Sequence, residues 1–322
     1  MPPLTLVVIG DPNASHIRLL KQLPSSVETI VSDDFEKLKE AAPKADILLN
    51  GGFHADLFRK VFPLVTKAQW VHNLSTGVEG ILSPEVIASP IPLTNGRGVF
   101  SSILAEFVIA GVLYFAKDFR RMIRNQVAGR WEPFDVDAIE GTTMAIIGYG
   151  DIGRTTAKLA HAMGMKVVAL RRRAALSVDD PHLTAIYPLE RLHEIIARCD
   201  YLVIATPLTP ETTGMIGEAE LNQLKKDAVV INVGRGPVIV ESVLIKALEE
   251  KRIKGAALDV FDKEPLPEGH PFYSMENVLL SPHCADHLPG WIDLAMNRFL
   301  SNFDLFSKGQ PLENIVDKKA GY

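Results

Sequence analysis

The sequence is poor in cysteine and has no excess of positive charge. Its 322 residues include two cysteines, Cys199 and Cys284, and the net charge is −5. Two cysteines so far apart exclude a disulfide-stapled scaffold and are typical of a reducing compartment. A mildly negative chain without a basic stripe argues against nucleic acid as a partner.

Long apolar runs are absent as well. No uninterrupted apolar stretch is long enough to cross a bilayer, so we expect no membrane association. The first residues, 1–4, carry no charged leader and continue into a strand-like run. We therefore expect no signal peptide and a cytoplasmic location. The length suits two domains.

Among the features that are present, a glycine-rich turn is the most informative. A strand-like run at 143–147 leads into Gly148-Tyr149-Gly150-Asp151-Ile152-Gly153, and a helix-forming run at 154–163 follows. Gly148 permits a tight turn, Gly150 lets a pyrophosphate approach the backbone, and Gly153 allows close packing of helix on sheet. The start of the helix offers unpaired N–H groups to phosphates. This order predicts dinucleotide binding.

Three arginines stand where an NAD-binding unit usually has an acidic residue. The second expected strand, 166–170, is followed by Arg171, Arg172 and Arg173, and no Asp or Glu occurs before Asp179. A guanidinium pairs bidentately with a 2′-phosphate, which a carboxylate would repel. We therefore predict NADP, used as NADPH, and keep NAD as the alternative. The plain alternative is a solvated basic turn.

Strand-like and helical runs alternate along the chain, which predicts parallel sheets. The first part has expected strands at 4–9, 27–31, 46–49 and 69–74, with helices at 15–23, 33–41 and 55–62. A long helix over 101–130, continuous or broken, then leads to a second part. There we expect six strands at 143–147, 166–170, 201–205, 228–233, 255–260 and 278–280, with helices between them. A final helix at 289–307 could return to the first domain. The predicted fold is α/β, with two doubly wound parallel-sheet domains.

Ligands of such sheets bind beyond the carboxyl ends of the strands. Arg235, Glu264 and His283 each follow a different strand, in loops fixed by glycine or proline. Together they suit reduction of a ketone next to a carboxylate: an imidazolium donates the proton, a carboxylate raises its pKa, and a guanidinium holds the substrate. Taken singly, they could be a surface ion pair, a loop charge and a helix cap.

With these motifs, the chain resembles the D-isomer-specific 2-hydroxyacid dehydrogenase family over nearly its whole length. The segments that carry the resemblance are 75–78, 97–100, 104–107, 148–153, 206–212, 232–236 and the loops of Glu264 and His283. The resemblance implies that Arg235, Glu264 and His283 are catalytic. It also implies a Rossmann cofactor domain, 101–288, inserted in a flavodoxin-like substrate domain formed by 1–100 and 289–322. A homodimer through the cofactor domains is implied too.

The resemblance further implies where ligands bind. The substrate carboxylate is expected at the backbone N–H groups of Ser75, Thr76, Gly77 and Val78. Cofactor contacts are expected from the glycine motif, the three arginines, Thr206, Pro207, Val233, Gly234, Arg235, Asp259 and His283. Relatives with arginines at this position resemble NADP-preferring reductases of glyoxylate, hydroxypyruvate and related 2-keto acids, and they give D-2-hydroxy acids.

Residues after His283 depart from the family pattern. Cys284, Asp286 and His287 stand where many members have small or apolar residues and then Gly or Trp. A polar substrate tail is therefore an open alternative. Cys284 is expected to be a small hydrophobe rather than a reactive thiol. His283 and His287 have the spacing of a helical metal pair, but no third ligand is evident, so we predict no metal site.

Two other functions share this fold. Oxidation of formate or phosphite is one, although a formate-type site would be expected to pair its histidine with Gln rather than Glu264. A dinucleotide-sensing regulator, like the corepressors that resemble this family, is the second. It would carry the same catalytic set, so the set alone does not separate it from a reductase.

Overall fold

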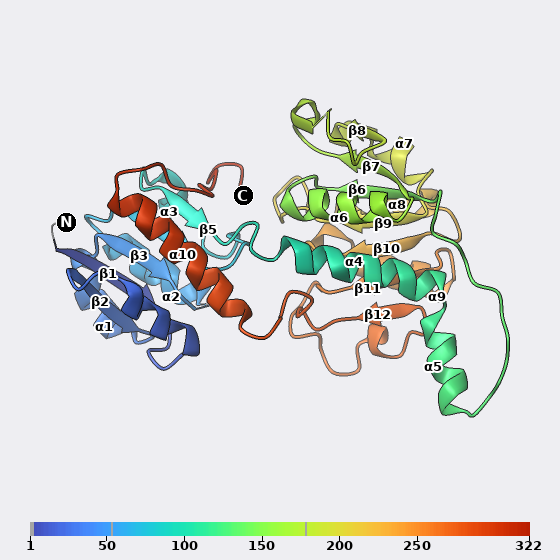
Figure 1. Ribbon diagram of the computed structural model, residues 1–322, viewed down its shortest axis with the longest axis horizontal. Helices are drawn as coiled ribbons and strands as arrows, with labels where there is room; N and C mark the ends of the chain where they lie inside the picture. The colour runs from blue at the N-terminus through green and yellow to red at the C-terminus, as the bar shows by residue number, and fades with distance from the viewer. Residues whose placement is uncertain (1–2, 53, 178) are drawn as a thin grey trace. The chain divides into compact units, whose positions relative to one another are not determined.

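The computed structural model describes residues 3–52, 54–177 and 179–322 (Figure 1). The chain divides into two compact units. Unit 1 is Met1–Val99 with His287–Tyr322, and unit 2 is Phe100–Asp286. Unit 2 is thus inserted in the sequence of unit 1. Met1 and Pro2, part of the segment in which we expect no leader, lie outside the described residues.

Unit 1 is built on a five-stranded parallel sheet in the order β2-β1-β3-β4-β5. This is the flavodoxin-like strand order. Its strands are β1 (Leu4–Ile9), β2 (Val27–Ser32), β3 (Ile47–Asn50), β4 (Trp70–Asn73) and β5 (Leu93–Asn95). Its helices are η1 (Ser15–Gln22), α1 (Phe35–Ala41), η2 (Ala42–Lys44), α2 (Ala55–Val61), η3 (Phe62–Leu64), α3 (Pro84–Ala88) and α10 (Trp291–Ser307).

The last helix of the chain packs on this first sheet. Strands β1, β3 and β4 are almost wholly buried, as expected when helices cover both faces of a parallel sheet. On one face, Phe299 of α10 stacks on Trp70 of β4, with ring centroids 5.1 Å apart. The tail beyond α10 then joins the edge strand, because Val316 N–H donates to the Leu93 carbonyl at 2.8 Å. Residues from both chain ends therefore share one core (Figure 1).

Unit 2 contains a seven-stranded parallel sheet in the order β12-β11-β10-β9-β6-β7-β8. Its strands are β6 (Thr143–Ile147), β7 (Lys166–Leu170), β8 (Ala185–Tyr187), β9 (Tyr201–Ile204), β10 (Val229–Asn232), β11 (Gly255–Leu258) and β12 (Val278–Leu280). Six of them follow the Rossmann order, with β12 added at one edge, and the chain reverses direction across the sheet between β6 and β9.

The helices of unit 2 cover both faces of its sheet (Figure 1). They are α4 (Ser101–Ala116), α5 (Phe119–Val127), α6 (Asp151–Ala162), η4 (Ala174–Ser177), η5 (Leu189–Arg191), α7 (Leu192–Ile196), α8 (Glu218–Gln223), η6 (Gly236–Val238), α9 (Glu241–Glu249) and η7 (Pro271–Tyr273). Helix α4 lies so close to the sheet that a Cβ on Gly111 would be 3.0 Å from the Cβ of Ala257.

The predicted fold class is confirmed, while some elements differ. The prediction missed β5 and β8, two strands of three residues at the edges of their sheets. The helix predicted at 15–23 is a 3-10 helix. The long helix predicted over 101–130 is interrupted at Asp118, which has φ +49° and starts α5 by accepting a hydrogen bond from Arg121 N–H. Within the described residues, none of the helices combines the length and apolarity that crossing a membrane requires.

Candidate active site

The glycine-rich turn joins β6 to α6. Gly148 has φ +94°, and a Cβ there would lie 2.6 Å from the carbonyl oxygen of Ala205, so this turn requires glycine. A Cβ on Gly153 would lie 2.4 Å from the Gly148 carbonyl oxygen, which shows how closely α6 approaches the strand. Apart from chain neighbours, no atom of the described residues lies within 4 Å of the Cβ position of Gly150. The turn therefore leaves room for a phosphate at Gly150.

The residues between these glycines serve different purposes. Helix α6 begins at Asp151 and continues through Ile152, so its first N–H groups lie next to Gly150. The side chain of Tyr149 is buried and donates a hydrogen bond to Asp180 Oδ2 at 2.9 Å. Burial, followed by this hydrogen bond, raises the pKa of Tyr149. Its side chain thus holds the neighbouring loop, and only its backbone is placed to face a phosphate.

The three arginines after β7 have different surroundings. Arg171 is half-buried and donates to Ser177 Oγ at 2.6 Å, whereas Arg173 is exposed. Arg172 Nη2 lies 3.4 Å from Glu211 Oε2, in the loop after β9. A hydrogen bond from Thr209, the backbone N–H of Glu211 and the charge of Arg172 together lower the pKa of Glu211. Arg172 therefore spans two loops at the carboxyl end of the sheet.

One further cation near this turn was not predicted. Arg154 Nε, on α6, lies 3.8 Å from Asp180 Oδ2, the same carboxylate oxygen that binds Tyr149. Its role was not predictable from the sequence, because an arginine near the start of a helix is usually a solvated surface residue. Arg154 adds positive charge to the region of the three arginines.

The loops after β9 and β10 touch each other beside the glycine turn. A Cβ on Gly234 would lie 2.7 Å from the Thr206 carbonyl oxygen. Asn232 fixes the second loop, accepting from Gly234 N–H and donating to the Arg235 carbonyl, both at 3.0 Å. The Thr206 hydroxyl is buried, and none of the described residues offers it a hydrogen-bond partner. An orphaned buried hydroxyl fits a site completed by a ligand. Pro207 and Val233 flank these contacts.

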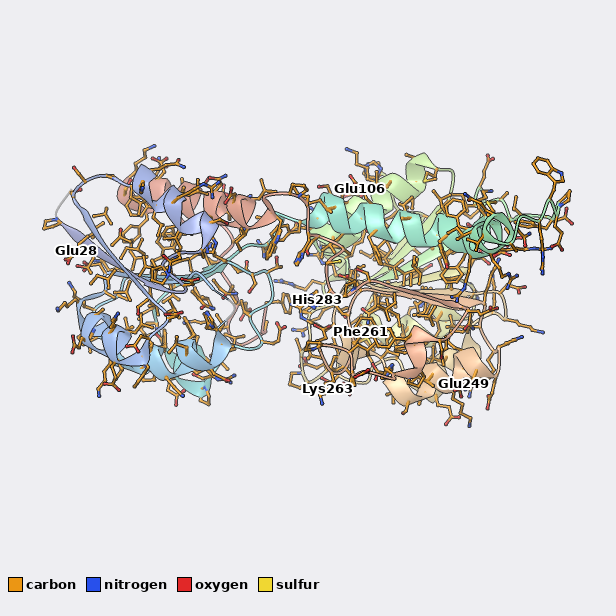
Figure 2. The ribbon with its side chains drawn as sticks, turned by 90° about the horizontal axis from the view of Figure 1, so that it is seen from below. Glu28, Glu106, Glu249, Phe261, Lys263 and His283 are labelled. Atoms are coloured by element: carbon orange, nitrogen blue, oxygen red, sulfur yellow. The ribbon has the colours of Figure 1, made fainter. Side chains whose placement is uncertain are left out.

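His283 and Glu264 form a close pair. His283 Nδ1 lies 2.5 Å from Glu264 Oε2, and the other carboxylate oxygen accepts from Phe261 N–H at 2.9 Å. Figure 2 shows His283 and Phe261 at the same end of unit 2. Since Glu264 occupies Nδ1, the Nε2 atom of His283 is the one directed away from the pair. His283 is 43% and Glu264 33% exposed, so solvent still reaches both.

The pair shifts both pKa values toward the charged forms. The hydrogen bond that His283 donates to Glu264, and then the charges of Glu264 and Asp259, raise the pKa of His283 against the opposing effects of burial and Arg235. Partial burial acts to raise the pKa of Glu264. Hydrogen bonds from His283 and Phe261, with the charges of His283 and Arg235, outweigh it and lower that pKa. The pair therefore favours the imidazolium form of His283 and the carboxylate form of Glu264.

Arg235 belongs to the same cluster. Its charge acts on the pKa of both His283 and Glu264, and its Nη1 donates to the Gly234 carbonyl at 2.8 Å. The next residue, Gly236, brings the two loops together: a Cβ there would lie 1.9 Å from the carbonyl carbon of Phe261. The structure therefore brings together the three residues that the sequence placed at separate strand ends.

Asp259 organises the loop that carries His283. The side chain is 2% exposed, and its Oδ1 accepts from Ser281 Oγ at 2.6 Å and from the N–H groups of Cys284 and Ala285 at 3.0 Å. Between these anchors His283 adopts φ +52°, which is uncommon for a residue with a side chain. The backbone of the loop is thus fixed from one buried carboxylate.

A second ionisable pair supports Glu264 and was not predicted. Glu241, the first residue of α9, accepts from Asp262 N–H and from His270 Nε2, both at 3.2 Å. The neighbouring N–H, that of Phe261, is bound by Glu264 itself. Two carboxylates thus hold successive amides of one turn. From the sequence, Glu241 reads only as an acidic residue favoured at a helix start.

The predicted substrate loop lies in unit 1. Ser75, Thr76, Gly77 and Val78 directly follow Leu74 at the end of β4; Thr76 is exposed, and Val78 is 2% exposed. His287 also belongs to unit 1, where its ring stacks on Trp291 at 4.3 Å. Cys284 and Asp286 belong to unit 2, and Cys284 Sγ lies 3.6 Å from Ser281 Oγ.

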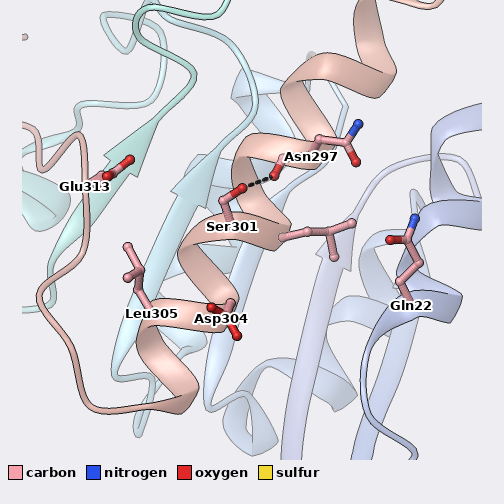
Figure 3. A pocket seen from close by; sticks show the side chains of 7 residues that line it. Gln22, Asn297, Ser301, Asp304, Leu305 and Glu313 are labelled. Carbon is pink, nitrogen blue, oxygen red and sulfur yellow. Dashed lines mark hydrogen bonds between the residues drawn. The ribbon is translucent and has the colours of Figure 1, made fainter.

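Unit 1 has a hollow that contains none of the predicted site residues (Figure 3). Its lining residues are Gln22, Asn297, Leu300, Ser301, Asp304, Leu305 and Glu313. Its lining polar groups include Ser301, whose hydroxyl donates back to the Asn297 carbonyl of its own helix. Over the part of the chain that the structure describes, no three His, Cys, Asp or Glu residues gather as metal ligands.

Comparisons with known proteins place the chain in a family. A family model described as D-isomer specific 2-hydroxyacid dehydrogenase, NAD binding domain, matches residues 109–285. A glyoxylate reductase of Aeropyrum pernix is 32% identical over 301 residues, 88% of this chain and 87% of the relative. A hydroxypyruvate reductase of Blautia hydrogenotrophica is 28% identical over 92% of this chain and 94% of the relative.

Solved structures extend the likeness to the whole fold. An NADPH-dependent glyoxylate/hydroxypyruvate reductase from Sinorhizobium meliloti, in complex with NADP and sulfate, has a TM-score of 0.84 at 25% identity. The alignment covers 100% of both chains. With a glycine turn, an imidazole–carboxylate pair and an arginine on one Rossmann sheet, this chain belongs to the D-isomer-specific 2-hydroxyacid dehydrogenase family.

Proposed function

We propose that this protein reduces a small 2-keto acid, such as glyoxylate or hydroxypyruvate, to the D-2-hydroxy acid with NADPH. The observation that carries the proposal is the His283–Glu264 pair at 2.5 Å, with the charge of Arg235 acting on both. A proton donor, its carboxylate partner and a cation thus stand at strand ends of the sheet that bears the glycine turn. The reductases named above support the same reaction.

The catalytic roles follow from which atoms are already bonded. NADPH bound at the glycine turn would supply a hydride for the carbonyl carbon. His283 Nε2 gives its proton to the carbonyl oxygen, because Glu264 occupies Nδ1. Glu264 stabilises the imidazolium before transfer and fixes the ring. Arg235 holds the substrate carboxylate through two parallel hydrogen bonds and stabilises negative charge on the oxygen.

We propose residues 101–288 as the cofactor domain. Gly148 to Gly153 hold the pyrophosphate, Arg171 to Arg173 hold the 2′-phosphate, and Thr206, Pro207, Val233, Gly234 and Asp259 border the rest of NADP. NAD remains a weaker alternative for the same site. The open position at Gly150 and the orphaned Thr206 hydroxyl support this assignment.

The cofactor assignment is tested by nucleotide binding. Arg172→Asp should raise the Kd for NADPH about tenfold and leave the Kd for NADH nearly unchanged, since one charge pair with the 2′-phosphate is lost. Binding is read from nucleotide fluorescence. Arg198→Asp is the matched control, because Arg198 is a surface arginine of unit 2 with 73% exposure. An unchanged NADPH-to-NADH ratio in Arg172→Asp would exclude Arg172 as the reader of the phosphate.

We propose residues 1–100 and 289–322 as the substrate domain, with the carboxylate bound by the N–H groups of Thr76, Gly77 and Val78 in the loop that begins at Ser75. The test is the rate of NADPH oxidation with glyoxylate, hydroxypyruvate, pyruvate, phenylpyruvate and branched 2-keto acids. Glyoxylate or hydroxypyruvate should give the highest kcat/KM. If none of these acids is reduced, the proposed reaction is wrong.

We also propose a cytoplasmic homodimer formed through unit 2. Helix α5 and the segment after it expose six large apolar side chains: Phe119, Met122, Ile123, Val127, Trp131 and Val136. Trp131 is 98% exposed, and so large an apolar group needs a partner surface. Light scattering should give twice the chain mass of 35.4 kDa, and Ile123→Glu with Val127→Glu should halve it. Ile87→Glu on unit 1 serves as the control and should leave the mass unchanged.

A further inference from the structure

Three asparagines end three adjacent strands of unit 1. Asn50 closes β3, Asn73 closes β4 and Asn95 closes β5, and the sheet register pairs Asn50 with Asn73 and Asn73 with Asn95. Their exposed fractions are 3%, 1% and 4%. Buried amide groups usually have hydrogen-bond partners, and of these three amides Asn50 Oδ1 alone lacks one among the described residues. The partners of these three amides show what the row does.

The direction of each amide is fixed by a neighbour. Asn50 Nδ2 donates to Asn73 Oδ1 at 2.8 Å, so the NH2 group of Asn73 must face away from Asn50. The oxygen of Asn95 accepts from Arg97 N–H at 3.2 Å, which sets its NH2 group in the same way. Neither amide can turn over without losing the bond at its oxygen.

The two NH2 groups bind successive carbonyls of the loop after β4. Asn73 Nδ2 donates to the Ser75 and Gly77 carbonyls, both at 3.0 Å. Asn95 Nδ2 donates to the Thr76 carbonyl at 2.6 Å. Three consecutive carbonyl groups are therefore held by side chains of the sheet edge.

This fixes the direction of the N–H groups that follow. In a trans peptide, the N–H points opposite to the carbonyl of the preceding residue. The cis peptide found among the described residues is Glu264–Pro265, so the peptides of this loop are trans. The N–H groups of Thr76, Gly77 and Val78 therefore point away from the asparagines. Across the described residues, none of these three N–H groups meets a hydrogen-bond acceptor.

We infer that Asn73 and Asn95 are positioning residues that shape the loop into a carboxylate cradle, and that Asn50 sets the orientation of Asn73. The inference rests on the proposed function and says how that function is built: neutral amides aim three N–H groups at the substrate carboxylate. Such a concave set of N–H groups binds anions without a charged side chain.

The test separates binding from folding. In Asn73→Ala the Ser75 and Gly77 carbonyls lose the amide that binds both of them. Each keeps one longer hydrogen bond, from Gly96 N–H and from the Ser75 hydroxyl respectively, so the loop is held less firmly and can turn its N–H groups aside. We expect the KM for glyoxylate and the Kd for oxamate, measured by calorimetry on the NADP⁺ complex, to rise about tenfold or more, as loss of a hydrogen bond to a charged group does. The Kd for NADPH and kcat should change much less.

Asn302→Ala is the matched control. Asn302 is 1% exposed, lies on α10 and holds the backbone of Glu313 through two hydrogen bonds, so the variant loses the same kind of interaction elsewhere in unit 1. It should lower Tm without changing the KM or oxamate binding. Asn95→Ala repeats the test if Asn73→Ala does not fold.

If Asn73→Ala or Asn95→Ala binds oxamate as tightly as the unaltered protein does, the inference is wrong. It is also wrong if the unaltered protein does not bind oxamate. Wild-type protein that binds oxamate but reduces no keto acid contradicts the proposed function instead.

Discussion

The two sheets of this protein carry different chemistry at their carboxyl edges. Unit 1 ends three of its five strands with asparagines, which have no charge. Unit 2 presents Arg235, Asp259, Glu264 and His283. A side-chain amide does not ionise near neutral pH, so its hydrogen bonds do not depend on pH in the physiological range. Ionisable groups can transfer protons, but their arrangement depends on pH. The same parallel-sheet architecture thus has an uncharged carboxyl edge in unit 1 and an ionisable carboxyl edge in unit 2.

Two histidines show the same contrast. His283 in unit 2 has a carboxylate partner and a raised pKa. His72 in unit 1 is fully buried beside Thr94, and burial, together with the charge of Arg298, lowers its pKa to about 3. The surroundings therefore favour the cationic form of His283 and the neutral form of His72. The surroundings, rather than the residue type, decide which histidine can act as an acid.

Removing His283, the proposed proton donor of unit 2, should have the largest effect on activity. His283→Ala should lower kcat roughly 10²- to 10⁴-fold, since the proton must then come from water. The Kd for NADPH should be nearly unchanged. The comparison with Asn73→Ala, which acts mainly on KM, is sharpest when both are measured with glyoxylate. Normal turnover in His283→Ala would remove this residue from the mechanism.

Neutralising the partner of His283 should move the pH profile. Reduction needs the imidazolium, so the rate is high below the raised pKa of His283 and falls as the pH rises through it. Glu264→Gln removes the main cause of the raised pKa, so the falling limb of kcat/KM should shift to lower pH. The fall in kcat at neutral pH should be about tenfold. A limb that stays in place would show that another group controls the profile.

His72 should make the stability of unit 1 depend on pH in the acid range. Its pKa is about 3 when folded and 6.5 in the reference state, so below pH 6.5 the unfolded chain binds a proton that the folded chain does not. The free energy of unfolding should fall by about 1.4 kcal/mol per pH unit from this residue until the pH nears 3. In urea titrations between pH 7 and 4.5, His72→Phe should show a slope smaller by one proton. An identical slope would mean that His72 does not stay neutral.

The smallest effect concerns matched helix caps in the two units. Asp34 caps α1 by accepting from Lys37 N–H at 2.9 Å, and Asp118 caps α5 at 3.3 Å with φ +49°. Asp34→Ala should cost about 1 kcal/mol of stability. Asp118→Gly should cost less, because glycine accepts the left-handed backbone. Urea midpoints measure both, and equal losses would show that the backbone angle is irrelevant.

The sequence reveals the elements whose signal lies within one segment. The glycine turn is predictable because strand, glycines and helix are contiguous, and Arg235, Glu264 and His283 because each directly follows an apolar run. The edge strands β5 and β8 have three residues each, which is too few for a strand pattern to be recognised in the sequence. The sequence leaves open whether the helix over 101–130 is broken, since neither proline nor glycine marks the break at Asp118.

The supporting residues are hidden for a different reason. Asn50, Asn73 and Asn95 form a row only after three strands are aligned, which single-chain patterns do not reveal. Glu241 and His270 meet across 29 residues, and neither belongs to a motif. Residues that contact the reacting groups can thus be found at strand ends, whereas residues that orient them depend on pairings of the folded sheet.

The insertion of unit 2 within unit 1 has a consequence for synthesis on the ribosome. All of Phe100–Asp286 leaves the exit tunnel before α10 does, yet Phe299 of α10 completes the core around Trp70. The sheet of unit 2 can therefore fold while the sheet of unit 1 still lacks α10. In a nascent chain stalled before α10, unit 2 should be folded and unit 1 should expose Trp70. We expect chaperones to bind the chain at this stage.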